Sequence, residues 1–183
     1  VRWEKVHVGD VVLIRNRELI PADIILLATS DTKQGIAYVE TSQLDGETNL
    51  KLRQCLEETR VCCPSAAMDE QHSESMEFNP NLLSGAIIDC EMPNNRIHTF
   101  EGSLKWNGAA YHLEPKQLLL RGCCIRNTKA AVGIVVFTGR DTKLMMNQRA
   151  TPLKRSSVEV LVNKTIAFLF ATEILLAVIC TIG

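Results

Sequence analysis

Apolar residues occur along most of this chain in short runs that are bounded by glycine, asparagine and proline. The runs are rich in Val, Ile and Leu, which is typical of β-strands. They predict strands within 8–14, 23–28, 37–41, 85–92, 97–104, 109–114, 117–125 and 130–137. Many short strands at fairly even spacing favour a sandwich or a jelly-roll-like barrel over a doubly wound sheet. We therefore expect a mainly β domain over residues 1–150.

Two segments of the predicted domain depart from the strand pattern. Residues 55–80, "CLEETRVCCPSAAMDEQHSESMEFNP", are polar and predict a short helix and a loop, which together form a variable insertion. Residues 139–147, "GRDTKLMMN", predict the start of a helix. Asp141 or Thr142 could cap that helix, because short polar side chains accept hydrogen bonds from the first free N–H groups.

The C-terminal end is almost wholly apolar from Thr165 to Ile182, with Glu173 as its only charge. At about 1.5 Å per residue this stretch is roughly 27 Å long, slightly less than the hydrocarbon core of a bilayer. A buried helix of a soluble protein is the alternative, but such a helix is rarely apolar on every face. We therefore predict a partial transmembrane helix over residues 165–183. A basic linker over 151–164 precedes it and places the β domain in the cytosol by the positive-inside rule.

The composition narrows the class of function only slightly. Lys plus Arg number 20 and Asp plus Glu number 21, so the charge balance gives no reason to expect nucleic-acid binding. The seven cysteines are odd in number and include two adjacent pairs, which indicates reduced thiols in the cytosol. The four histidines lack metal-ligand spacing. There is neither a GxGxxG sequence nor a Walker A loop to bind a nucleotide.

The segment "LDGETNLKLRQ", residues 44–54, is the strongest candidate for chemistry. Taken alone, it reads as a tight turn, because Asp45–Gly46 is a favourable turn sequence and Glu47 would then be a solvated side chain. Its second interpretation is a loop that presents the Glu47 carboxylate to a substrate outside the chain. The surrounding sequence decides between the two.

Six segments in order give the chain a resemblance to the actuator domain of P-type ATPases. They are "VGDVV" (8–12), "IPADIILLATSD" (20–31), "YVETSQLDGETNLKLRQ" (38–54), "FEGSL" (100–104), "LLLRGCCIRNT" (118–128) and "FTGRDTKLMMN" (137–147). Cation-pumping members carry TGES where this chain has DGET. Asp45, followed by Asn49 and Lys51, makes the chain resemble the type-IV branch, which flips phospholipids.

The resemblance implies a distorted jelly roll, or double-stranded β-helix, located between the second and third membrane helices. The phosphorylated aspartate, the nucleotide-binding domain, Mg²⁺ and ATP would all lie outside this chain, which lacks the DKTGT sequence. The chain would be inert alone. Its implied partners are the phosphorylation domain of the same polypeptide, the phospholipid substrate, the membrane and, as in many relatives, an accessory β-subunit.

The resemblance also implies roles for the DGET residues. Glu47 would align and activate the water that hydrolyses an aspartyl phosphate. Gly46 would let the backbone approach the phosphate, and Thr48 would orient the loop or the water. Asp45 would either brace the turn by accepting backbone N–H groups or hold the loop away from the phosphate until the domain rotates.

Several other polar residues are weaker candidates. We expect Asp23 to tie a turn together. Arg121, Arg126 and Lys129 either contact the phosphorylation domain or lie on a solvated strand edge. Glu173, at membrane depth, either pairs with a neighbouring helix or lies near a water-filled crevice. Two alternative functions also stay open at this point: an actuator domain of a cation pump, and a non-enzymatic β module tethered to a membrane.

Overall fold

The computed structural model describes residues 2–31, 33–60, 83–148 and 157–182. The chain divides into two compact units, Val1–Gln148 and Arg149–Gly183, and each is described by itself. Of the predicted insertion over 55–80, the residues from 61 onward lie outside the described ones. Its first part contains the short helix α2 (Glu57–Arg60), as predicted.

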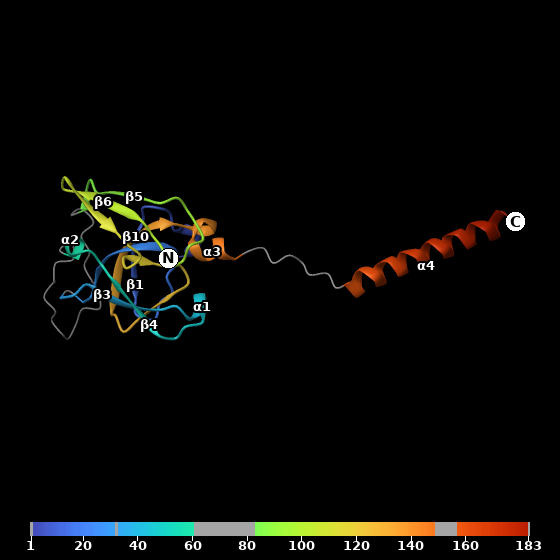
Figure 1. Cartoon of the computed structure of the whole chain (residues 1–183), viewed down its shortest axis with the longest axis horizontal. Helices are drawn as coiled ribbons and strands as arrows, with labels where there is room; N and C mark the ends of the chain where they lie inside the picture. Colours follow the sequence, from blue (N-terminus) through green and yellow to red (C-terminus); the bar gives the residue numbers. More distant parts are fainter. Residues whose placement is uncertain (1, 32, 61–82, 149–156, 183) are drawn as a thin grey trace. The chain divides into compact units, whose positions relative to one another are not determined.

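The first unit is mainly β, which confirms the predicted fold class (Figure 1). Its strands are β1 (Val11–Arg15), β2 (Asp23–Thr29), β3 (Ile36–Glu40), β4 (Leu50–Gln54), β5 (Ile87–Cys90), β6 (Gly102–Trp106), β7 (Ala109–Leu113), β8 (Leu118–Leu119), β9 (Cys124–Arg126) and β10 (Ala130–Phe137). They form three antiparallel sheets in the orders β1-β10-β2-β8, β4-β3-β9 and β5-β6-β7. Short helical segments are η1 (Trp3–Lys5), α1 (Ser42–Asp45), η3 (Gly139–Asp141) and α3 (Lys143–Asn147).

The strands β2 and β10 form the centre of the core. Every residue of β2 is buried, which explains why its sequence is apolar without alternation. Gly133 of β10 lies at a shift in the β10–β2 register. A Cβ added there would come within 2.3 Å of the Ile24 side chain and 2.6 Å of the Ile25 carbonyl oxygen. Glycine at this position therefore permits the close approach of the two strands.

The predicted strand over 117–125 is in fact two strands of different sheets. β8 pairs with β2, whereas β9 pairs with β3. Between them the chain turns at Arg121–Gly122, and Gly122 has a φ of +83°, a conformation that favours glycine. The prediction of one continuous strand is wrong because the apolar run continues through the turn, where Cys123 is also buried.

Two further boundaries differ from the sequence prediction. The predicted strand over 97–104 begins only at Gly102, although Phe100 before it is buried in the core. A side chain can be buried without its backbone pairing in a sheet, so the apolar Phe100 did not indicate where the strand begins. Strand β4 was not predicted, because it contains no continuous apolar run: its two leucines alternate with charged residues. That alternation is itself typical of a strand with one buried face.

Helix α3 is held by residues far away in the sequence. Thr142 occupies the N-cap position, but its hydroxyl donates to the Gly139 carbonyl oxygen and caps nothing. The predicted capping by Asp141 or Thr142 is therefore wrong. Asp23 of β2 takes that place, since its Oδ2 accepts the Lys143 N–H at 2.7 Å and its Oδ1 accepts the Arg121 N–H at 2.9 Å. Asp23 thus ties chain segments together, as expected.

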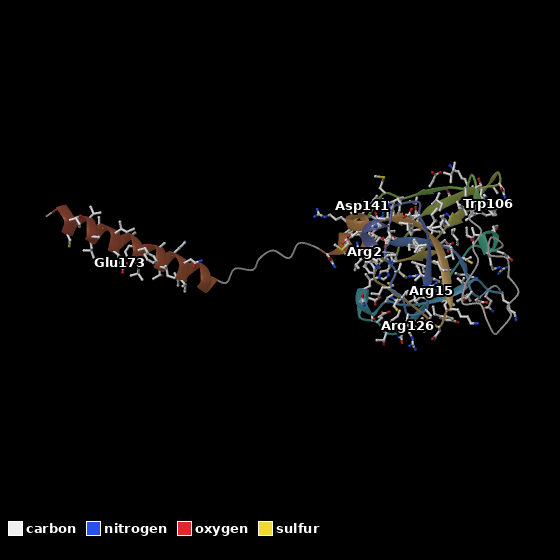
Figure 2. All side chains as sticks on the ribbon, turned by 180° about the vertical axis from the view of Figure 1, so that it is seen from behind. Arg2, Arg15, Trp106, Arg126, Asp141 and Glu173 are labelled. Atoms are coloured by element: carbon white, nitrogen blue, oxygen red, sulfur yellow. The ribbon has the colours of Figure 1, made fainter. Side chains whose placement is uncertain are left out.

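The second unit contains one helix, α4 (Ser157–Ile182). Residues Leu161–Thr181 are long and apolar enough to cross a membrane by length and composition. The helix begins before Thr165, so residues 157–164 are helical rather than part of an irregular linker. No glycine or proline interrupts that stretch, and the helical hydrogen-bond pattern continues through it. Glu173 projects from this helix (Figure 2).

Candidate functional site

The DGET residues connect β3 to β4 through a single helical turn, α1 (Figure 1). Gly46 ends that turn with a φ of +76°, and its N–H donates to the Ser42 carbonyl oxygen at 3.1 Å. A left-handed residue at this position is the usual way to end a helix, and glycine adopts it without strain. A Cβ on Gly46 would meet nothing within 4 Å, so the backbone conformation, and not space within the domain, requires glycine. The chain reverses here and presents Glu47 beyond the turn.

Asp45 is the most heavily bonded side chain of this segment. Its carboxylate accepts the Thr41 hydroxyl at 2.9 and 3.0 Å, and its Oδ1 accepts the Glu47 N–H at 3.0 Å. The Lys51 ammonium donates to its Oδ2. The bond from Lys51 is the main cause that lowers the pKa of Asp45 to about 2. Asp45 therefore accepts a backbone N–H of the turn, as in one of the two roles expected for it.

Glu47 is turned outward from the same braced loop. Its side chain is 58% exposed, compared with 24% for Asp45, so its carboxylate is accessible to a molecule outside the domain. The nearest cation is Lys51, whose Nζ lies 3.1 Å from the Glu47 Oε2. Thr48 is also exposed, and its hydroxyl makes no hydrogen bond to any other described residue. The side chains of Glu47 and Thr48 are therefore both accessible from outside the domain.

Lys51 also belongs to this site. In the sequence it indicates only the resemblance to the type-IV branch. From β4 it contacts both carboxylates of the motif, and its pKa is raised first by the hydrogen bond to Asp45. The sequence feature that could have indicated this contact is the spacing of four residues between Glu47 and Lys51. That spacing indicates a contact only on a helix. Here the contact arises because the loop folds back over β4.

The Asp45–Lys51 pair makes a prediction about pH. In the Lys51→Gln variant we expect the pKa of Asp45 to rise from about 2 toward its ordinary value of 3.8. Because the folded-state pKa is depressed, the pair stabilises the fold above the unfolded pKa, and this contribution is lost as the pH falls from 3.8 through about 2. The carboxyl ¹³C shift of Asp45, followed by NMR below pH 5, measures it. Lys105→Gln, on β6, is the control and should leave the titration unchanged. An Asp45 titration that is identical in all three proteins would contradict the assigned pair.

The other predicted residues lie elsewhere and are mostly engaged within the domain. The Arg126 Nε donates to the Glu40 Oε2 at 2.6 Å, and Arg126 lies at the edge of the β unit (Figure 2). The Arg121 guanidinium donates to the Gly139 carbonyl oxygen and lies over the Trp3 ring. Lys129 is exposed. Arg126, on the edge strand β9 with 39% of its side chain exposed, and Lys129 both have the solvated position that was one expectation for all three residues.

The described residues include no group of three or more His, Cys, Asp or Glu side chains that could hold a metal ion. The five cysteines in these parts of the chain are free thiols, and two of them, Cys55 and Cys123, are buried. Burial raises the pKa of the Cys55 thiol to about 11 and that of Cys123 to about 12. Both thiols therefore stay protonated at neutral pH and are poor nucleophiles.

Comparison with known proteins shows which family this chain resembles. The family model for the P-type ATPase actuator domain matches residues 1–151. The chain is similar to phospholipid-transporting ATPase IC of Xenopus tropicalis, with 39% identity over 100% of this chain and 14% of the relative. It is similar to phospholipid-transporting ATPase tat-1 of Caenorhabditis elegans, with 41% identity over 100% of this chain and 15% of the relative. Its identity to phospholipid-transporting ATPase DRS2 of Saccharomyces cerevisiae is 40%, over 100% of this chain and 12% of that protein. The chain thus spans about a seventh of the length of these relatives.

Proposed function

Since this chain belongs to the family of P-type ATPase actuator domains, we propose that it is the actuator domain of a phospholipid-transporting ATPase of the type-IV branch. In that enzyme the DGET loop hydrolyses the aspartyl-phosphate intermediate. Sequence identity of about 40% over the whole of this chain, to a part of relatives that carry this name, supports the proposal. The observation that carries it is the outward-facing Glu47 carboxylate on a loop that Asp45 braces.

The chemistry follows from what this loop can present to a phosphoryl group. Glu47 accepts a proton from a water that attacks phosphorus, while the bond from phosphorus to the aspartyl oxygen breaks. The products are inorganic phosphate and the free aspartate carboxylate. Gly46 leaves the backbone bare at the point of approach, and the exposed Thr48 hydroxyl is available to orient the water. Asp45 keeps the loop rigid, so that Glu47 arrives in one geometry.

The reaction needs parts that lie outside this chain. The aspartyl phosphate belongs to the phosphorylation domain of the same polypeptide, and ATP and Mg²⁺ are bound there and in the nucleotide-binding domain. Helix α4 crosses the membrane, with the β unit on the cytosolic side. The phospholipid is the substrate of the whole enzyme, and an accessory β-subunit is a further partner. This chain alone is inert.

The cation-pump alternative is less well supported, for a structural reason. Where cation pumps have a threonine, this chain has Asp45, which contacts Lys51. A threonine there could not neutralise that lysine, so the aspartate and the lysine form a matched pair that is tied to the DGET form of the loop. The non-enzymatic module is disfavoured by the family to which the chain belongs.

The proposal is tested by the substrate dependence of the intact ATPase that contains this domain. We expect its ATP hydrolysis in detergent to increase several-fold when a phospholipid is added, because substrate release is coupled to breakdown of the phosphoenzyme. The measurement is phosphate release with phosphatidylserine, phosphatidylcholine or phosphatidylethanolamine. Na⁺, K⁺ and Ca²⁺, each added without lipid, are the controls. Stimulation by one of these cations and by none of the lipids would support the cation pump instead.

A further inference from the structure

Strand β4 places its charged and apolar side chains the opposite way from an ordinary surface strand. Leu50 and Leu52 are 39% and 46% exposed, whereas Lys51 and Arg53 are half-buried on the other face. These two cations lie opposite the buried residues Val39 and Ala37 of β3. A strand with one face in the core normally turns its apolar residues inward. The inner side of β4 therefore carries two cations, Lys51 and Arg53, where a strand of this kind normally has apolar side chains.

The two inward cations border a cavity of about 280 Å³. Asp45 and His98 also line it, and Leu120 and Pro115 close it on the side of β8. Drug-sized ligands occupy cavities of roughly 300–1,000 Å³. This cavity is thus large enough for a small polyatomic ion and too small for a nucleotide.

Arg53 is the member of this cavity that lacks an acidic partner. Its Nη1 donates to the Pro115 carbonyl oxygen at 3.1 Å, and no described carboxylate lies within 4 Å of its guanidinium. Burial lowers the pKa of Arg53, which shows that its charge is poorly solvated where it stands. A half-buried cation without a counter-ion is costly, and two or more donor groups of the guanidinium remain for an anion. By contrast, Lys51 already neutralises Asp45.

We infer that this cavity is a binding site for a small tetrahedral oxyanion, inorganic phosphate, with Arg53 and Lys51 as its main ligands. The planar guanidinium can donate two parallel hydrogen bonds to two phosphate oxygens, the Lys51 ammonium adds a third donor, and the His98 imidazole supplies an N–H. Because the charge of Lys51 is compensated by Asp45, Arg53 supplies the uncompensated positive charge, and Lys51 contributes the remaining N–H of its ammonium group as a hydrogen-bond donor. Lys51 thus lines the cavity and also contacts Glu47, which does not line it.

This inference stands on the residues of the cavity and does not require the proposed hydrolysis. If the proposed function also holds, inorganic phosphate is the product released beside Glu47, and the cavity, which is lined by Asp45 and Lys51, is placed to receive it. The two claims separate experimentally, because Glu47 does not line the cavity. Glu47→Gln should therefore slow hydrolysis about 10²–10⁴-fold without weakening phosphate binding.

The test is phosphate binding to the full chain in detergent micelles. Thermal unfolding is followed as potassium phosphate is added, with potassium chloride at equal ionic strength as the reference. We expect a saturable rise in Tm with phosphate alone. NMR amide shifts should change first at Lys51, Arg53 and His98, which locates the site in the wild-type protein without any variant.

Three variants give the expected changes in affinity. Arg53→Gln should weaken phosphate binding about tenfold or more, because it removes a charge-assisted pair of hydrogen bonds. Arg53→Lys keeps the charge and the fold but loses the planar fork, so it should weaken binding by a smaller factor. Lys105→Gln removes one positive charge from β6, far from the cavity lining, and should leave binding unchanged.

Two results would overturn the inference. The first is a phosphate effect that equals the chloride effect or that persists unchanged in both Arg53 variants. The second is Arg53-dependent binding of ATP that is tighter than that of phosphate, because this would make the cavity part of a nucleotide site and contradict the argument from its size.

Discussion

Glu47→Gln in the intact ATPase should leave the aspartyl phosphate intact long after the wild-type enzyme has hydrolysed it. Glutamine keeps the size of the side chain but can neither accept the proton of the attacking water nor carry its charge. General bases contribute about 10²–10⁴-fold to such reactions, so breakdown of the phosphoenzyme should slow by that factor. Its formation from ATP uses other domains and should be unchanged.

The measurement is a chase of radiolabelled phosphoenzyme with unlabelled ATP, together with steady-state ATP hydrolysis and lipid transport. Phosphoenzyme should accumulate while the other two activities collapse. Glu57→Gln is the matched control, because Glu57 on α2 is an 83% exposed glutamate in the same unit. If Glu47→Gln loses its phosphate as fast as the wild type, the DGET segment is only a turn.

The neighbouring substitutions should have graded effects on the same chase. Thr48→Ala removes a hydroxyl that contacts no other described residue, so it should slow breakdown less than Glu47→Gln while leaving the stability of the domain unchanged. Asp45→Asn keeps an oxygen for the Glu47 N–H but loses the ion pair with Lys51. It should alter stability and the timing of hydrolysis more than the chemical step.

Asp23→Ala should be the most damaging single change to the fold of the β unit. Asp23 is fully buried, and its two oxygens accept the backbone N–H groups of Arg121 and Lys143. Removing the carboxylate leaves two donors without partners at about 1–3 kcal/mol each, so we expect a loss of about 4 kcal/mol. A domain is stable by only about 5–15 kcal/mol, which makes this a large fraction.

Urea unfolding of the full chain, followed by tryptophan fluorescence, measures that loss. Asp10→Ala is the matched control, since Asp10 also accepts a backbone N–H, from His7, but its side chain is 48% exposed. Water can replace Asp10, so that variant should lose about 1 kcal/mol or less. Equal losses in the two variants would show that the buried contacts of Asp23 do not anchor α3 and the Arg121 turn.

The sequence by itself determined the fold class and the position of the membrane-length helix. Short runs of Val, Ile and Leu bounded by turn residues predict strands because the apolar runs and the breakers are local properties of the chain. For the same reason, the apolar stretch after Thr165 predicted most of α4. The order of six motif segments determined the family, and with it the candidate Glu47.

Only the tertiary structure decided which side chains work together. The apolar run over 117–125 divides between two sheets because Gly122 permits a left-handed turn, and a hydropathy pattern does not contain that turn. Asp23 reaches the N-terminus of α3 across 120 positions of sequence. Lys51 meets Asp45 and Glu47 because the loop folds back over β4, and Arg53 faces inward because Leu50 and Leu52 face outward. Such contacts depend on strand register and chain reversal. These are set by packing across the whole domain, and no local segment of the sequence encodes them.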